Sequence, residues 1–196
     1  MLTRIITGVT GIAAAAVIIT KGGELFSIAV IVLSIIGWYE FRQLAASKGY
    51  HVYYMTSGLP VVLITSAAGI YYVYFWSRLD VMNLFFWLLI VTIVFFLLTM
   101  LEALIHYCCC NGEKWLVNTG LSVFGMLYCG LLFSYIIILR TFDREKLVDL
   151  GFITIDYGEA LLWAILLGTW ASDTFAYFFG RAIGRHPFCR VSPKKH

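Results

Sequence analysis

Residues 81–101 read VMNLFFWLLIVTIVFFLLTML, a run with no charged residue. A helix that crosses the hydrocarbon core of a bilayer takes ~17–25 predominantly apolar residues, and this run has that length. It does not alternate apolar and polar residues, as the strands of a membrane barrel do. The run therefore predicts a transmembrane α-helix. The same criteria of length and apolar composition are applied to the rest of the chain.

Five further apolar stretches have similar lengths and are bounded by charged or turn-forming residues. They cover roughly residues 2–20, 25–41, 57–76, 117–139 and 159–179. The whole chain of 196 residues is 61% hydrophobic and 13% charged, whereas soluble proteins are about 45–50% apolar and about 25% charged. The predicted fold is all-α: a polytopic transmembrane helical bundle of about six spans, in a single transmembrane domain over residues 1–196.

The first stretch also has features of a signal peptide, namely Arg4, an apolar run and small residues at 13–16. Because five more apolar stretches follow it, a membrane span is the favoured interpretation.

The distribution of Lys and Arg between the loops predicts which side faces the cytoplasm. With six spans, nine of the 14 Lys and Arg residues fall on the side of the N-terminus and five on the other side. Cytoplasmic loops carry the excess of positive charge. The chain is therefore predicted to be a multi-pass protein of the cell inner or plasma membrane, with both termini cytoplasmic.

The five cysteines match neither a disulfide framework nor a CxxC metal pair, so reduced thiols are expected. Cys108, Cys109 and Cys110 form a triplet next to a span, where S-palmitoylation occurs in some proteins. Free thiols with no special role are the simpler interpretation.

The other acidic residues, Asp156 and Glu159 among them, lie at span ends or in loops and are interpreted as ordinary solvated or interfacial charges. Asp173 differs from them because it lies inside a predicted span. It stands ~10 Å along the helix before Gly180. A carboxylate at that depth is costly unless it is paired, hydrated or bound to a metal. Asp173 is therefore predicted to face the protein interior, on one helix face with Thr169, Tyr177 and Gly180. The alternative is a structural aspartate that is satisfied by Thr169, by Ser172 or by a neighbouring helix.

The segment after the last predicted span is basic and contains no acidic residue. Guanidinium and ammonium groups are the usual protein ligands of phosphate, but they also anchor membrane proteins to anionic lipid headgroups. The residues alone leave both interpretations open, and nucleic acid is not an expected partner of a six-span protein. The basic residues are Arg181, Arg185, Arg190, Lys194 and Lys195.

Residues 170–195, WASDTFAYFFGRAIGRHPFCRVSPKK, resemble the central part of the phosphatidate cytidylyltransferases, the CDP-diacylglycerol synthases. That family's pattern is W-x-x-D-x-x-A-Y-x-x-G-R, followed by G-[KR] and by S-P-K-K. Weaker similarity covers the rest of the chain, for example RIITG at 4–8 and GMLY at 125–128. The matching positions are Trp170, Asp173, Ala176, Tyr177, Gly180, Arg181, Gly184, Arg185, Ser192, Pro193, Lys194 and Lys195.

The resemblance implies a nucleotidyltransferase of phospholipid biosynthesis, which makes CDP-diacylglycerol and pyrophosphate from CTP and phosphatidic acid at the bilayer surface. It implies Mg²⁺ as the cofactor, because a divalent cation stabilises charge on the attacking and leaving oxygens. Basic residues would neutralise the triphosphate, and Asp173 would be a metal ligand. The implied site residues are Asp173, Lys194 and Lys195 for catalysis, and Arg181, Arg185 and Ser192 for substrate binding.

The family pattern continues beyond S-P-K-K with Ser or Thr, an acidic residue and Gly, and later with an acidic signature. Position 196 is His, so the chain is interpreted as the N-terminal and central part of the family without its C-terminal catalytic segment. Alone, it is expected to bind CTP weakly, to form no CDP-diacylglycerol and to self-associate as a homo-oligomer. The alternative hypotheses are a non-catalytic membrane protein derived from this family and a small transporter that uses Asp173.

Overall fold

The computed structural model describes residues 2–75, 81–110, 114–143, 145–149, 151 and 153–183, and most of them are helical. Helices α1 (Leu2–Lys21) and α2 (Gly23–Ser47) come first. The π-helical turns η1 (Tyr54–Gly58) and η2 (Tyr71–Phe75) flank α3 (Leu59–Ile70) in one continuous rod. After α4 (Val81–Cys110), a second composite rod contains α5 (Trp115–Gly125), η3 (Met126–Leu131) and α6 (Leu132–Thr141). A hairpin of β1 (Leu147–Asp149) and β2 (Thr154–Asp156) leads into α7 (Tyr157–Ile183).

The all-α prediction is confirmed, since the predicted apolar stretches fall on these helices. Four helical segments of the described residues are long and apolar enough to cross a membrane: Gly23–Ser47, Tyr54–Tyr74, Met82–Cys108 and Trp115–Thr141. In α1 the described apolar part, Thr10–Lys21, is shorter, and α7 is not among the four. The predicted total of about six spans is therefore not confirmed. The antiparallel hairpin, with Val148 opposite Ile155, was not predicted at all.

The outward faces of the helices are apolar, as a lipid environment requires. On α4 the side chains of Phe86, Trp87 and Leu97 are 57%, 66% and 60% exposed. Soluble monomers rarely expose contiguous apolar surface on the scale of a whole helix face. The exposed apolar surface thus supports the conclusion that the chain is a membrane protein.

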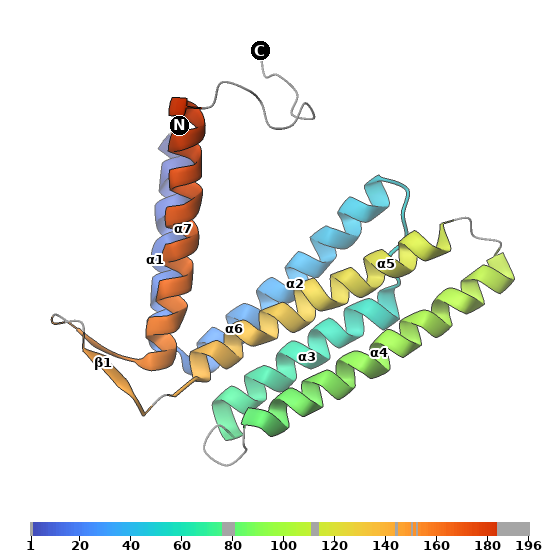
Figure 1. Ribbon diagram of the computed structural model, residues 1–196, viewed down its shortest axis with the longest axis horizontal. Helices are drawn as coiled ribbons and strands as arrows, with labels where there is room; N and C mark the ends of the chain where they lie inside the picture. Colours follow the sequence, from blue (N-terminus) through green and yellow to red (C-terminus); the bar gives the residue numbers. More distant parts are fainter. Residues whose placement is uncertain are drawn as a thin grey trace.

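Helices α2 to α6 form a tilted bundle that is held by close backbone approach and by interhelical hydrogen bonds (Figure 1). The indole Nε1 of Trp38 on α2 donates to the hydroxyl of Ser57 at 3.0 Å. A Cβ added to Gly130 would lie 3.2 Å from the Cα of Val61, so this glycine lets η3 lie against α3. Helices in lipid usually pack through small residues and hydroxyl groups. The burial of apolar side chains contributes little to their association, because lipid tails are as apolar as the side chains.

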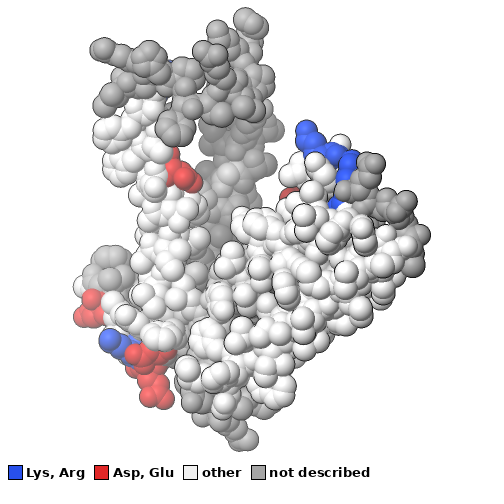
Figure 2. Space-filling model, turned by 45° about the vertical axis from the view of Figure 1, so that its right-hand side comes forward, with Lys and Arg blue, Asp and Glu red and all other residues white. Residues whose placement is uncertain are grey.

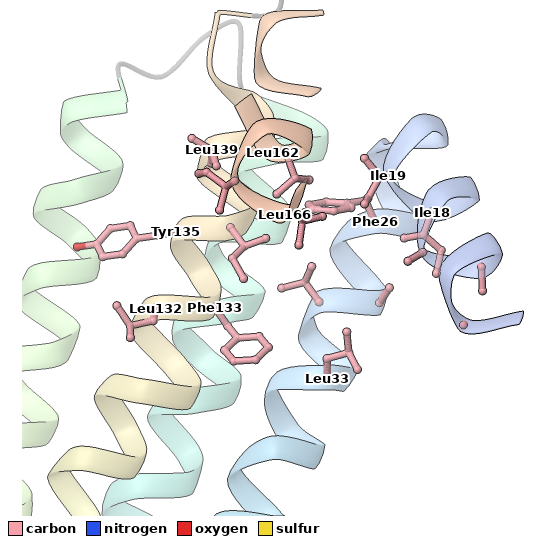
Figure 3. A pocket seen from close by; sticks show the side chains of 17 residues that line it. Ile18, Ile19, Phe26, Leu33, Leu132, Phe133, Tyr135, Leu139, Leu162 and Leu166 are labelled. Atoms are coloured by element: carbon pink, nitrogen blue, oxygen red, sulfur yellow. The ribbon is translucent and has the colours of Figure 1, made fainter. Parts of the chain in front are cut away.

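Helices α1 and α7 stand apart from this bundle and meet it at one end, from which the two parts diverge (Figure 1). The cleft between them has a volume of about 620 Å³ and an apolar lining. Figure 3 shows side chains from four helices around it, among them Ile18 of α1, Phe26 of α2, Leu139 of α6 and Leu162 of α7. The whole divergent arrangement therefore depends on the short junction where the two parts meet.

Candidate functional site on α7

Helix α7 begins at the junction, and the sequence explains why it begins there. Asp156 is the last residue of β2, and its Oδ1 accepts a hydrogen bond from the backbone N–H of Glu159 at 2.8 Å. An aspartate in this position satisfies one of the amide groups that the first turn of a helix leaves unpaired. It also places negative charge at the positive end of the helix dipole.

Arg140, near the end of α6, pairs with the carboxylates of this first turn. Its side chain is 4% exposed, and its Nη1 lies 2.6 and 2.8 Å from the two carboxylate oxygens of Asp156. Its Nη2 lies 3.4 Å from Glu159 Oε2, and its Nε donates to the carbonyl of Ile19 at 3.3 Å. The indole of Trp163 donates to the other oxygen of Glu159 at 3.3 Å. One guanidinium thus ties α6 to the start of α7 and the end of α1.

Two glycines make room for this cluster. A Cβ on Gly158 would lie 2.5 Å from the carbonyl oxygen of Arg140. Gly22 has a φ of +59°, which favours glycine, and a Cβ there would lie 2.8 Å from the hydroxyl of Tyr72 and 3.1 Å from Arg140 Nη2. The same Tyr72 hydroxyl accepts a hydrogen bond from the N–H of Gly23 at 2.8 Å. The junction is therefore closely packed around a buried charge.

The interpretation of Asp156 and Glu159 as ordinary solvated or interfacial charges is wrong. Glu159 is 6% exposed, and its carboxylate and that of Asp156 are committed to Arg140. A pattern in the sequence could have predicted this pairing of charges. An arginine ends one apolar stretch and an Asp-x-x-Glu begins the next, so all three lie at the same end of two consecutive helices. Burial of the charges requires that they pair.

The second half of α7 is quite different, because it is exposed on all sides from Leu167 to Arg181. Asp173, Tyr177 and Arg181 follow one another at intervals of four residues, so they share one face of the helix. Arg181 Nη1 donates to the Tyr177 hydroxyl at 3.3 Å. This face is the candidate functional site: a carboxylate, a phenol and a guanidinium on a rigid helix.

The carboxylate of Asp173 is exposed and makes no hydrogen bond or ion pair with any described residue. The prediction that it faces the protein interior is therefore wrong for the part of the chain that the structure describes. The structural alternative does not hold within that part either, since the Thr169 hydroxyl donates to its own helix, to the carbonyl of Ile165 at 2.8 Å. Asp173 is left available for a ligand.

Four of the six predicted site residues lie outside the described residues: Arg185, Ser192, Lys194 and Lys195. The structure therefore brings Asp173 and Arg181 onto one helix face and says nothing of the rest. The thiols of Cys108 and Cys129 are free, as expected, while Cys189 also lies outside the described residues.

Among the described residues, no group of three or more His, Cys, Asp and Glu side chains could hold a metal ion. The two carboxylates at the junction are already paired with Arg140, whose positive charge opposes a cation there. Of the two carboxylates on α7, that of Asp173 has no partner among the described residues, whereas that of Glu159 is paired. A single carboxylate fits Mg²⁺ when phosphate oxygens and water supply the other ligands, as is common for this ion. The donor set thus suits an ion that arrives with a phosphorylated substrate.

Comparison with known proteins shows which family the chain belongs to. A model of the cytidylyltransferase family matches residues 2–196. Phosphatidate cytidylyltransferase 5, chloroplastic, of Arabidopsis thaliana is 28% identical over an alignment of 191 positions, gaps included, that covers 91% of this chain and 45% of that protein. Phosphatidate cytidylyltransferase 4, chloroplastic, of the same plant is 24% identical over an alignment of 198 positions that covers 91% of this chain and 46% of that protein. No solved structure matches. The chain thus spans about half the length of these relatives, and it belongs to the cytidylyltransferase family.

Proposed function

We propose that this chain takes part in cytidylyl transfer from CTP to phosphatidic acid, which yields CDP-diacylglycerol and pyrophosphate. The observation that carries the proposal is an uncommitted carboxylate and guanidinium on one exposed helix face, inside the matched family region. The printed names of the two relatives supply the substrate class. The membrane setting agrees with a lipid substrate and a lipid product.

The reaction assigns a task to each residue of the site. A phosphate oxygen of phosphatidic acid attacks the α-phosphorus of CTP, and the bond from that phosphorus to the pyrophosphate oxygen breaks. Arg181 neutralises phosphate charge, and the Tyr177 hydroxyl at 3.3 Å holds its guanidinium in place. We assign phosphate contacts to Arg185 and Ser192 as well, and charge stabilisation during transfer to Lys194 and Lys195.

Mg²⁺ belongs to the proposal, with Asp173 as one protein ligand and the phosphate oxygens of CTP among the others. When bound, it would stabilise negative charge on the transferring phosphate. Asp173 suits this role because no described side chain competes for its oxygens.

The proposal includes six membrane crossings with both termini on the CTP side, in the inner or plasma membrane. In the structure α1 begins at the same end of the molecule at which α7 ends (Figure 1), as an even number of crossings requires. Reporter domains fused after residue 144 and after residue 195 should therefore report opposite compartments. Reports from the same compartment would contradict the six crossings.

The exposed second half of α7 leaves a place for further helices or a second copy, so a homo-oligomer is part of the proposal. The alternatives of a non-catalytic membrane protein and of a transporter are not favoured, because the family match and the names of both relatives indicate transfer chemistry.

The test is a transfer assay in vesicles that contain phosphatidic acid, with CTP labelled in its α-phosphate. The chain is reconstituted alone and together with the segment of a relative that it does not match, and labelled CDP-diacylglycerol is measured. We expect label in the lipid in the second case, and a loss of at least about 100-fold in both Asp173→Asn and Arg181→Ala. The matched control is Thr169→Ala, because Thr169 lies one turn away and bonds only its own helix in the structure. Transfer that is equally fast in all three variants would contradict the site.

A further inference from the structure

We propose that the end of α2 and the start of α5 bind an anionic phospholipid, at a site separate from the face of α7. The site would take the phosphate of the headgroup between Lys48 and Lys114, and an acyl chain in the groove below them. It is independent of cytidylyl transfer, since none of its residues lies on α7.

The groove is apolar and lies between two helices. It has a volume of about 280 Å³ and is lined by Phe41, Leu44, Ala45, Lys48, Tyr50, Val117 and Leu121. Leu44 is 63% exposed and Val117 is 46% exposed, so the groove is open to the surroundings of the bundle. In a membrane those surroundings are acyl chains, which match such a lining.

The turn that closes α2 builds the upper end of the groove. Gly49 has a φ of +74°, and its N–H bonds the carbonyl of Ala46 at 2.9 Å, while the N–H of Tyr50 bonds that of Ala45 at 3.0 Å. This pair of bonds is the Schellman motif, in which a glycine reverses the chain at the end of a helix. The motif turns the chain so that Tyr50 and Ala45 both line the groove, and Lys48 is exposed at the rim.

A second lysine reaches the same turn from the other helix. The Nζ of Lys114 donates to the carbonyl of Gly49 at 3.3 Å and lies 5.3 Å from the centre of the Tyr50 ring. An ammonium group has three donors, so this arrangement leaves donors of Lys114 for a phosphate oxygen. Figure 2 shows a group of Lys and Arg side chains at this end of the bundle, and a further one beside acidic side chains at the lower left.

The other charged groups nearby do not cancel this charge. Arg42 lies 5.3 Å from the ring of Tyr54, a residue that does not line the groove. Glu40 is two helical turns before Lys48, ~12 Å along α2, and neither residue forms an ion pair among the described residues. An apolar groove with two ammonium groups at its interfacial rim is complementary to a lipid with a negatively charged phosphate headgroup.

The test measures lipid retention. The purified chain is placed in bilayer discs of phosphatidylcholine with added phosphatidylglycerol, extracted gently, and the retained lipid is counted by native mass spectrometry. We expect phosphatidylglycerol to be retained in preference to phosphatidylcholine, and the double variant Lys48→Ser/Lys114→Ser to retain it roughly tenfold to thirtyfold less. Lys48→Arg/Lys114→Arg should keep the retention, because it keeps both charges.

Two further variants separate a built site from general attraction to positive charge. Lys21→Ser removes an exposed lysine at the end of α1, beside the first residues of α2, and should leave the retention unchanged. Val117→Trp fills the groove with both lysines in place and should reduce it. A loss in Lys21→Ser equal to that in the double variant would overturn the proposal, and so would full retention in Val117→Trp. Displacement of the lipid by inorganic phosphate alone would also overturn it, because the acyl chain would then contribute nothing.

Discussion

The two halves of α7 carry similar residues in opposite environments. In the first half, Asp156 at its start and Glu159 are held by the buried Arg140. In the second half, Asp173 and Arg181 are exposed, and the carboxylate of Asp173 has no partner among the described residues. The same helix thus contains a closed charge cluster and an open one.

In a membrane helix, a structural charge differs from a functional one in whether its partners are already present. A buried charge that keeps all its partners can hold helices together, because breaking the set leaves an uncompensated charge in a medium of low dielectric constant. A carboxylate that is exposed and unpaired adds no stability, and inside a predicted span it is tolerated only where water or a ligand reaches it. We therefore expect such a carboxylate to serve binding or catalysis.

The largest effect on stability is expected from Arg140→Met. The substitution keeps most of the apolar stem but leaves Asp156 and Glu159 without their cation. Removing one partner of a buried ion pair costs about 3–5 kcal/mol, and the free energy of unfolding in mixed micelles should fall by that amount. The control is the triple variant Arg140→Met/Asp156→Asn/Glu159→Gln, which also removes the negative charges. It should recover part of the loss, and a single variant as stable as the parent chain would show that the cluster does not hold the junction.

The next effect is expected from Gly158→Ala. The added Cβ would lie 2.5 Å from the backbone carbonyl of Arg140, which cannot move like a side chain, so α6 and α7 must separate. Overpacking of this kind costs about 1–3 kcal/mol. The matched control is Gly168→Ala on the same helix, where a Cβ would meet nothing within 4 Å. That variant should gain up to about 1 kcal/mol from helix propensity. Equal effects of the two substitutions on the melting temperature would contradict the close approach.

Some parts of this structure can be predicted from the sequence, and others cannot. The apolar stretch at 81–101 predicts α4 because the length and uniform hydrophobicity of a helix in lipid are local properties. The hairpin before α7 escaped prediction because strands of three residues have no usable period. The cluster around Arg140 escaped prediction because the partners of this arginine come from α1, β2 and α7, and an Arg at the end of a predicted span usually indicates only the orientation of that span. The helical spacing correctly predicted Asp173 and Tyr177 on one helix face, but it indicated neither that Arg181 joins this face nor that the face is exposed.

A smaller effect is expected from Trp163→Phe. The substitution keeps an aromatic ring but removes the indole N–H that donates to Glu159 at 3.3 Å. An interhelical or intrahelical hydrogen bond of this kind in a membrane protein contributes about 0.6 kcal/mol. The free energy of unfolding should fall by roughly that amount, while Trp170→Phe, at an exposed position of the same helix, should leave it unchanged. A larger loss in Trp170→Phe would indicate that the second half of α7 is packed in the membrane after all.

The smallest effect on stability, and the largest on function, is expected from Asp173→Asn. The side chain is exposed and makes no contact with the described residues that the amide would lose, so the free energy of unfolding should change by less than about 0.5 kcal/mol. Transfer in the reconstituted assay should nevertheless fall by at least about 100-fold, because an amide cannot supply the negative charge that a cation on the triphosphate requires. Arg140→Met gives the opposite pattern, a loss of stability that explains any loss of transfer. If Asp173→Asn instead stabilised the chain by several kcal/mol with full transfer, the carboxylate would be an unsatisfied charge without a function, and the contrast between the two halves of α7 would disappear.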